Sequence, residues 1–229
     1  MKKLILLSVL MGFSIITYSQ EKNFHFGASF NAKITSLNLD NEVLGSSHSE
    51  FSYTLSGNMY LDLGNKFQLI SGVSFSQYHF NLIDYYPIFL CDISPNGVDP
   101  HNSYLKNSYH TSYIGIPVEG RWKITGEKNS LFLQFGFEGL YKIRLKEKTT
   151  LYECNKLSES EWLPGYSKFY DLNNFQLLSK FGIGYEFHLS KKLKLFFEPN
   201  IEYSLTNYFD WELVNSKYFN IGLNTGIVF

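Results

Sequence analysis

The sequence lacks several features that would narrow its class. It has 2 cysteines and 6 prolines among 229 residues, and neither cysteine directly follows the N-terminal leader, so neither is placed for lipid attachment. After its first residues it has no long uninterrupted apolar run, which excludes a transmembrane helix. Once Lys2 and Lys3 are taken from the 20 basic residues, 18 remain against 21 acidic residues. This mildly acidic balance gives no reason to expect nucleic-acid binding.

The first residues have the layout of a secretory leader. A short cationic start precedes an apolar run over 4–16, and Thr17 and Ser19 are small residues at plausible −3 and −1 cleavage positions. The run is too short to span a membrane as a helix. We therefore predict a signal peptide over 1–19 and a single exported domain over 20–229.

The exported part is rich in aromatic residues, with 17 Tyr and 21 Phe in the whole chain. Apolar and polar residues alternate with a period of two in eight segments, which indicates β-strands. The segments run approximately over 23–33, 50–63, 66–80, 108–124, 130–145, 174–189, 192–206 and 217–229. Between Ser130 and Leu145, for example, the odd positions are mostly apolar and the even ones mostly polar or glycine.

Such alternation suits a lipocalin-type barrel with an apolar interior, or a membrane barrel with an apolar exterior. Three features favour the membrane barrel. Most strand glycines lie on the polar face, where a narrow lumen needs small residues. The links are alternately short and long, as periplasmic turns and extracellular loops are. The polar face also carries both charges at mid-strand, which we predict to form a lumen charge network: Glu119, Arg121, Glu138, Lys142, Arg144, Lys180, Glu186, Glu198 and Glu202.

The predicted fold is thus all-β: an eight-stranded antiparallel up-and-down transmembrane β-barrel with short periplasmic turns and long extracellular loops. Closure pairs the last strand, over 217–229, with the first. Phe219 and Phe229 are then expected to face lipid, with Phe229 at the periplasmic interface where aromatic girdles occur. We interpret these two residues as a signal read by the barrel-assembly machinery.

The strand "SYIGIPVEGRWKI" (112–124), followed by "LFLQFGFEG", "FGIGYEF", "LFFEPNIEYSLTN" and "YFNIGLNTGIVF", resembles the PorT-like outer-membrane β-barrel proteins of Bacteroidetes. The similarity covers nearly all of the exported part, although its motifs are structural and individually loose. It implies an eight-stranded barrel in the outer membrane. Some members of that family are tied to protein secretion. The resemblance supplies no catalytic residue.

Two predicted extracellular loops hold the candidate partner residues. Tyr85, Tyr86 and Phe89 lie in one loop, and Trp162 and Tyr166 in another. Exposed aromatic clusters suit a binding surface, but they could equally pack on one another over the barrel mouth. One cysteine falls in each loop, so Cys91 and Cys154 could form a disulfide in an oxidising compartment.

Catalytic signals are weak. His79 and His110 fall near the outer ends of adjacent strands, close to serine residues, but neither belongs to a nucleophile motif. No stretch has metal-ligand spacing, so we expect no metal and no cofactor. We predict a non-enzymatic outer-membrane barrel that acts as a binding or accessory component of the envelope, related to secretion or adhesion. Its expected partners are outer-membrane lipid, the assembly machinery and envelope or secretion-complex proteins. The alternatives are a lipid-modifying enzyme at the rim and a soluble periplasmic lipocalin-like carrier.

Overall fold

Antiparallel β-strands account for most of the described residues. The structure, a computed structural model, describes residues 24–39, 46–85, 104–125, 129–153, 156–159, 173–190, 192–209 and 216–229. Its strands are β1 (Phe24–Leu39), β2 (Ser46–Asp62), β3 (Phe67–Tyr85), β4 (Tyr104–Lys123), β5 (Asn129–Glu153), β6 (Lys156–Glu159), β7 (Phe175–His188), β8 (Lys194–Ser204) and β9 (Ser216–Val228). In this part of the chain, no helix has the length and apolar character needed to cross a membrane.

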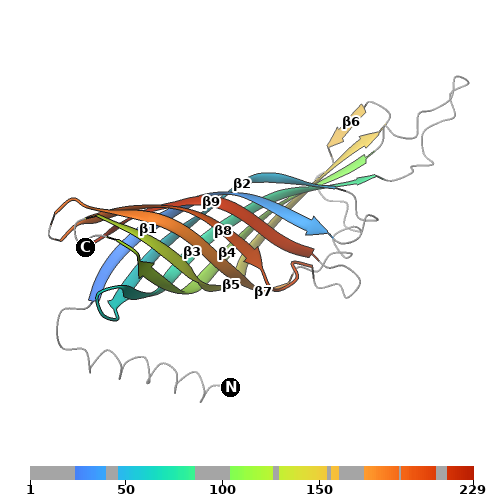
Figure 1. Ribbon diagram of the computed structural model, residues 1–229. Helices are drawn as coiled ribbons and strands as arrows, with labels where there is room; N and C mark the ends of the chain where they lie inside the picture. Colours follow the sequence, from blue (N-terminus) through green and yellow to red (C-terminus); the bar gives the residue numbers. More distant parts are fainter. Residues whose placement is uncertain are drawn as a thin grey trace, which may run out of the picture.

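Every strand except β6 belongs to a closed barrel. The order around the ring is β4-β3-β2-β1-β9-β8-β7-β5, and a pairing of β4 with β5 completes it. The first and last strands pair from Gly27↔Val228 to Leu39↔Ser216. The predicted eight-stranded antiparallel barrel is therefore confirmed. Figure 1 shows the tilted strands, with the short strand β6 lying beyond the rim beside the end of β5.

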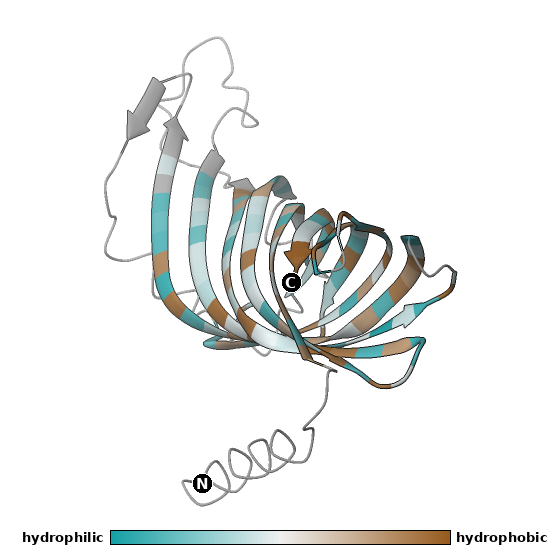
Figure 2. Ribbon diagram, turned by 90° about the vertical axis from the view of Figure 1, so that its left-hand side faces the viewer, coloured by the Kyte–Doolittle hydropathy of each residue, from teal (hydrophilic) through white to brown (hydrophobic). Residues whose placement is uncertain are grey.

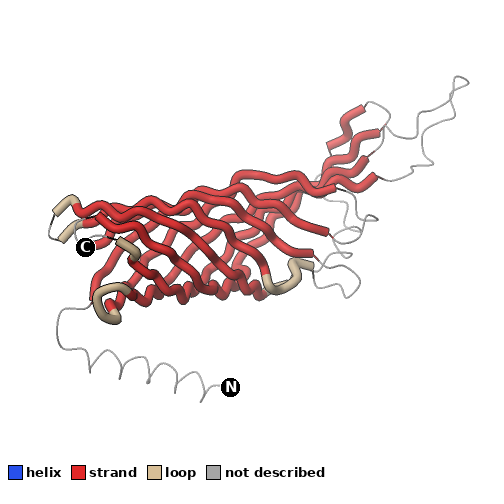
Figure 3. The backbone as a smooth tube through the Cα atoms, viewed as in Figure 1, coloured by secondary structure: helices blue, strands red, loops and turns tan. Residues whose placement is uncertain are grey.

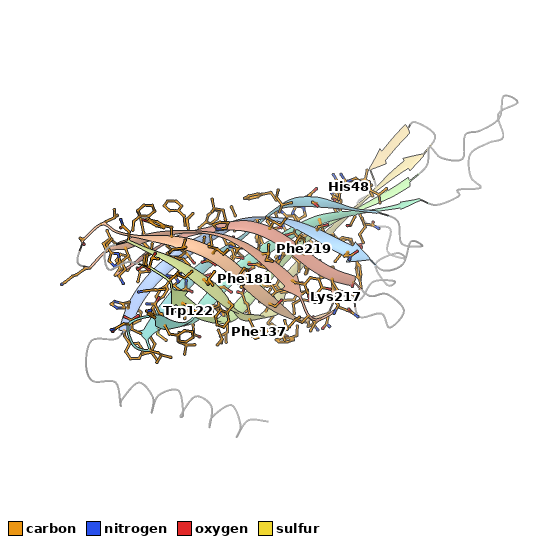
Figure 4. All side chains as sticks on the ribbon, viewed as in Figure 1. His48, Trp122, Phe137, Phe181, Lys217 and Phe219 are labelled. Carbon is orange, nitrogen blue, oxygen red and sulfur yellow. The ribbon has the colours of Figure 1, made fainter. Side chains whose placement is uncertain are left out.

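The barrel wall is apolar outside and largely polar inside. Side chains along β8 alternate between exposed and buried, with Phe197 and Ile201 exposed and Glu198 and Glu202 buried. The same alternation of apolar and polar residues runs along the strands in Figure 2. In Figure 4 the labelled Phe137, Phe181 and Phe219 lie on the outer surface. A wall of this kind suits lipid outside and is the reverse of a lipocalin.

The two ends of the barrel differ in the length of their connections. Residues 63–66 join β2 to β3, and residues 189–193 join β7 to β8. These short links lie at the end of the barrel that also holds the C-terminus, which we name the turn end (Figure 3). The opposite end, the loop end, receives the longer connections. Figure 4 shows Trp122 towards the turn end and His48 at the loop end.

Three neighbouring strands are longer than the sequence pattern indicates. Strand β3 continues to Tyr85, β4 begins at Tyr104 and β5 reaches Glu153, whereas the pattern placed these limits near 80, 108 and 145. Cross-strand pairing continues as far as Tyr104↔Tyr152. Because these added residues are mainly polar, hydropathy alone did not mark them as strand. Together with β6 they form a sheet beyond the rim, which we call the extension.

A β-bulge in β5 interrupts the regular alternation. Tyr113 of β4 pairs with Lys142, but the preceding Ser112 pairs with Arg144, so Ile143 is an extra residue on β5. An extra residue reverses the direction of all later side chains in a strand. The even positions of β5 thus face the lumen before the bulge and the outside after it.

Candidate functional site

Buried side chains divide the lumen into three layers. An aromatic plug lies nearest the loop end and consists of Leu37, Tyr78, Phe80, Leu82, Tyr109, Tyr113, Leu140, Leu178, Tyr208, Phe209 and Tyr218. A smaller cluster lies nearer the turn end and consists of Tyr60, Ile70, Phe132, Phe196 and Val228. Between them runs a charged band, contributed by strands around the whole barrel.

Lys180 on β7 is the centre of the charged band. Its Nζ lies 2.5 Å from Glu138 Oε2, 3.4 Å from Glu119 Oε1 and 3.7 Å from Glu202 Oε1. These carboxylates come from β5, β4 and β8 respectively, so one ammonium group ties together four strands. Glu138 also accepts a short hydrogen bond from Ser74 of β3.

A second lumen cation, the buried Lys33 on β1, shares Glu202 with Lys180. Lys33 Nζ lies 2.8 Å from Glu202 Oε2 and donates to the Tyr78 hydroxyl at 2.8 Å. It therefore links the charged band to the aromatic plug. Lys33 is absent from the charge network predicted from the sequence, although its position among the inward-facing odd residues of β1, between the outward-facing Ala32 and Ile34, was a usable signal.

Arg121 on β4 joins the charged band to the cluster near the turn end. Its Nε donates to Gln134 at 2.9 Å, and its Nη1 lies 3.3 Å from Glu186 Oε2. The guanidinium group also lies 4.0 Å from the ring centroid of Phe132 and 4.7 Å from that of Phe196. These cation–π contacts provide a buried charge with partners on several sides.

Glu198 occupies a separate position in the band. Its side chain is buried, and its Oε2 accepts a hydrogen bond from Asn224 Nδ2 at 3.3 Å. A Cβ atom at Gly182 would collide with its carboxylate. The absence of a side chain at Gly182 therefore makes the space that Glu198 fills.

Side chains fill the lumen in the described part of the barrel. The charged band encloses a polar cavity of about 20 Å³, lined by residues that include Asn31, Asn58, Glu119 and Arg121. This volume is enough for about one ordered water molecule. Above it, the plug residues Tyr78, Tyr113 and Tyr218 are each 0 % exposed. The layers thus hold the strands together and leave little room for ions to pass.

The predicted charge network is only partly gathered in one place. Glu119, Glu138, Lys180 and Glu202 lie together, while Arg121 and Glu186 form the neighbouring group described above. Lys142 is half-buried. Arg144 differs from the expectation: it is exposed, because the bulge at Ile143 turns it outwards.

The rim histidines form a pair without catalytic partners among the described residues. His79 and His110 are cross-strand neighbours with ring centroids 4.2 Å apart. The nearby serine hydroxyls are directed elsewhere, since Ser76 contacts Thr54 at 2.8 Å and Ser112 accepts from Gln77 at 3.5 Å. The described segments also contain no group of three or more His, Cys, Asp or Glu residues able to hold a metal ion.

The other predicted site residues lie at the two ends of the strands or outside the described residues. Phe219 and Phe229 are exposed, and the backbone N–H of Phe229 donates to Phe26 O at 2.7 Å. Tyr85 ends β3 and pairs with Tyr104. The remaining aromatic residues of the loops and both cysteines lie outside the described part: Tyr86, Phe89, Cys91, Cys154, Trp162 and Tyr166.

Comparisons with known proteins give a family match and distant structural likenesses. A family model described as "Outer membrane protein beta-barrel domain" matches residues 18–210. Neisserial surface protein A has a TM-score of 0.41 at 9% identity, over 90% of this chain and 96% of its own. The attachment invasion locus protein Ail of Yersinia pestis has a TM-score of 0.39 at 14% identity, over 91% of this chain and 100% of its own. The outer membrane protease OmpT of Escherichia coli has a TM-score of 0.39 at 10% identity, over 92% of this chain and 97% of its own. No curated protein sequence matches the chain.

Proposed function

The chain belongs to the family of outer membrane protein β-barrel domains, and from this premise we propose that it is a non-enzymatic barrel that binds an envelope partner through its loop end. The observation that carries the proposal is the extension, in which β3, β4 and β5 continue beyond the rim and β6 adds a further strand. A sealed barrel that continues as an open sheet on one side offers a surface fixed to a rigid scaffold, which is how many binding proteins present their contact residues.

Several finer features complete the proposal. We propose that residues 1–19 are a cleaved signal peptide and that the barrel is PorT-like and of Bacteroidetes type, as the sequence motifs indicate. Its partners would be outer-membrane lipid around the wall, the assembly machinery at β9 through Phe219 and Phe229, and a secretion-complex or adhesion partner at the loop end. No cofactor is required for any of these roles.

Binding is favoured over conduction because of the filled lumen. The buried Lys33, the half-buried Lys180 and their carboxylates occupy the centre of the barrel, and the plug covers them at the loop end. An eight-stranded barrel has room for little more than its own side chains. We therefore expect no stable single-channel conductance when the protein is inserted into planar bilayers.

Site-specific photo-crosslinking in the native envelope tests the binding role. A crosslinker at the half-buried Lys106 in the extension is expected to capture a partner protein, whereas one at the exposed Asn65 in a short turn serves as the control at the other end. Crosslinks at Lys106 that disappear when residues 146–159 are replaced by a short turn would support the proposal. Equal capture at both positions, or none at Lys106, would contradict it.

The lipid-modifying enzyme is a second candidate, favoured only by the close His79–His110 pair. Its test is direct: purified protein is incubated with outer-membrane lipids, and the products are followed by mass spectrometry. Under the binding proposal, lipid composition stays unchanged. Turnover that is lost in His79→Ala and His110→Ala would replace the binding proposal with the enzymatic one.

A further inference from the structure

The outer surface of β3, β4 and β5 changes from apolar to cationic within one step along the strands. One cross-strand row consists of Phe75, Ile114 and Tyr141. The next row towards the loop end consists of Gln77, Ser112 and Arg144, and the row after it of His79, His110 and Lys146. The boundary of the apolar belt on this side of the barrel is therefore followed at once by basic side chains.

The bulge in β5 creates this arrangement. Without the extra residue Ile143, Arg144 and Lys146 would point to the lumen side; with it, both are exposed on the outside. Glu147, which follows Lys146, pairs with Tyr109 of the plug and interacts with it on the opposite face. Two cations thus stand on the outer face of β5, while the acidic residue that follows them is turned away.

The acidic group near this face is Glu50 of β2, and the two histidines are its other titratable groups. Glu50 is engaged by Asn81 through a short hydrogen bond. Partial burial and the neighbouring imidazole of His110 lower the pKa of His79, which disfavours its charged form. Arg144 and Lys146 are therefore the cations of this face that lie nearest the apolar rows.

An apolar groove lies directly below the cationic rows. It has a volume of about 450 Å³ and is lined by Val73, Ile114, Ile116, Gly139, Tyr141 and Phe175, among others. Gly139 leaves its floor open, since a Cβ atom added there would come no closer than 3.5 Å to Phe175. Figure 4 marks Phe137, which precedes Gly139 on the same outward face of β5.

We propose that this face binds one acylated, phosphate-bearing lipid of the outer leaflet, with an acyl chain in the Gly139 groove and the phosphate group on Arg144 and Lys146. The spacing fits, because Tyr141–Ile114 and Arg144–Ser112 are adjacent outward rows, about 7 Å apart along β4. Arginine forms bidentate hydrogen bonds with phosphate, and lysine adds a point charge. The site requires only that the barrel is embedded in the membrane, so it is independent of the proposed partner at the loop end.

Native mass spectrometry of the full-length protein in detergent micelles tests the site. Phosphatidic acid is titrated against diacylglycerol with the same acyl chains, which lacks the phosphate group, and inorganic phosphate is added as a competitor. We expect one phosphatidic acid per protein, bound roughly tenfold more tightly than diacylglycerol, and no displacement by inorganic phosphate at millimolar concentration.

Matched variants separate the two halves of the site. The double variant Arg144→Gln with Lys146→Gln should weaken phosphatidic acid binding roughly tenfold and leave diacylglycerol binding unchanged. Gly139→Leu should weaken the binding of both lipids. The controls are Lys66→Gln with Lys192→Gln, which removes two exposed cations at the turn end, and Gly57→Leu on the outside of β2, where an added Cβ meets nothing within 4 Å. Both controls should bind like the wild type.

Several outcomes would overturn the proposal. Equal binding of the two lipids would show that Arg144 and Lys146 do not bind the phosphate group. Equal lipid binding by the Gly139→Leu and Gly57→Leu variants would show that the groove does not bind the acyl chain. Displacement by inorganic phosphate would indicate a site for free anions, and displacement by polyglutamate without any effect of Gly139→Leu would indicate an acidic protein partner. Heat-modifiable migration on gels verifies folding of each variant. Should Gly139→Leu not fold, Ile116→Trp fills the groove from its other wall and is judged by the same criterion.

Discussion

The two sides of the barrel wall differ in what lies beyond the apolar belt. Strands β7, β8 and β9 have 14, 11 and 13 residues, whereas β3, β4 and β5 have 19, 20 and 25. The shorter side ends close to the rim, and the longer side continues as the extension (Figure 1). Both sides share the same lumen charges. We infer that the short side and the lumen provide the scaffold, while the long side carries the binding surfaces.

The strongest test of this division is the removal of the cation shared by both sides. Lys180→Met leaves Glu119, Glu138 and Glu202 without their common partner. Breaking a buried ion pair from one side costs about 3–5 kcal/mol, and we expect a loss of that size in the free energy of unfolding. Urea titration followed by gel migration measures it. Lys66→Met, in an exposed turn, is the control, and an equal loss in both variants would contradict a structural role for the band.

The next test concerns the close approach of β4 and β5. In Gly136→Ala, the added Cβ would lie 2.6 Å from the Cα of Glu119 and even closer to a backbone oxygen of Val118. Overpacking against backbone costs about 1–3 kcal/mol. At Gly57 the same change meets open space, so Gly57→Ala should alter stability by no more than about 0.5 kcal/mol. The comparison fails if the two variants unfold at the same urea concentration.

A smaller effect than that of Lys180→Met is expected where the charged band meets the plug. Tyr78→Phe removes the hydroxyl that accepts from Lys33, while Glu202 still holds the ammonium group. Loss of one hydrogen bond to a charged group should cost about 1.5–3 kcal/mol at most, and clearly less than Lys180→Met. Unfolding at pH 7 measures the difference. A loss as large as that of Lys180→Met would mean that the plug, rather than the band, holds Lys33.

The smallest effect should come from the extension itself. Replacing residues 83–107 and 146–172 by short turns removes the sheet beyond the rim but leaves the residues of the lumen layers in place. We therefore expect the barrel to keep its heat-modifiable migration, with stability changed by less than about 1 kcal/mol, while partner crosslinking is lost. If the barrel no longer assembled, the long side would belong to the scaffold and the division between the two sides would be wrong.

The sequence pattern was informative wherever alternation was regular. From Leu131 to Tyr141 it gave both the strand and the side that faces lipid, because a two-residue period leaves no ambiguity once one face is buried. It was insufficient at Ile143, since the alternation of apolar and polar residues continues to Leu145, whereas the bulge reverses the direction of the side chains that follow it. Lys33 was overlooked for another reason, namely that its partners Glu202 and Tyr78 are distant in the chain.

Composition and periodicity by themselves determined that this protein is a β-barrel with an apolar outside and a charged inside, because each strand must satisfy both environments along its own length. Only the tertiary structure decided which charges meet. Lys180 collects carboxylates from three other strands, and the register between β4 and β5 turns Arg144 away from the lumen and towards the membrane surface. Such contacts depend on the closure and stagger of the whole ring, which no single strand encodes.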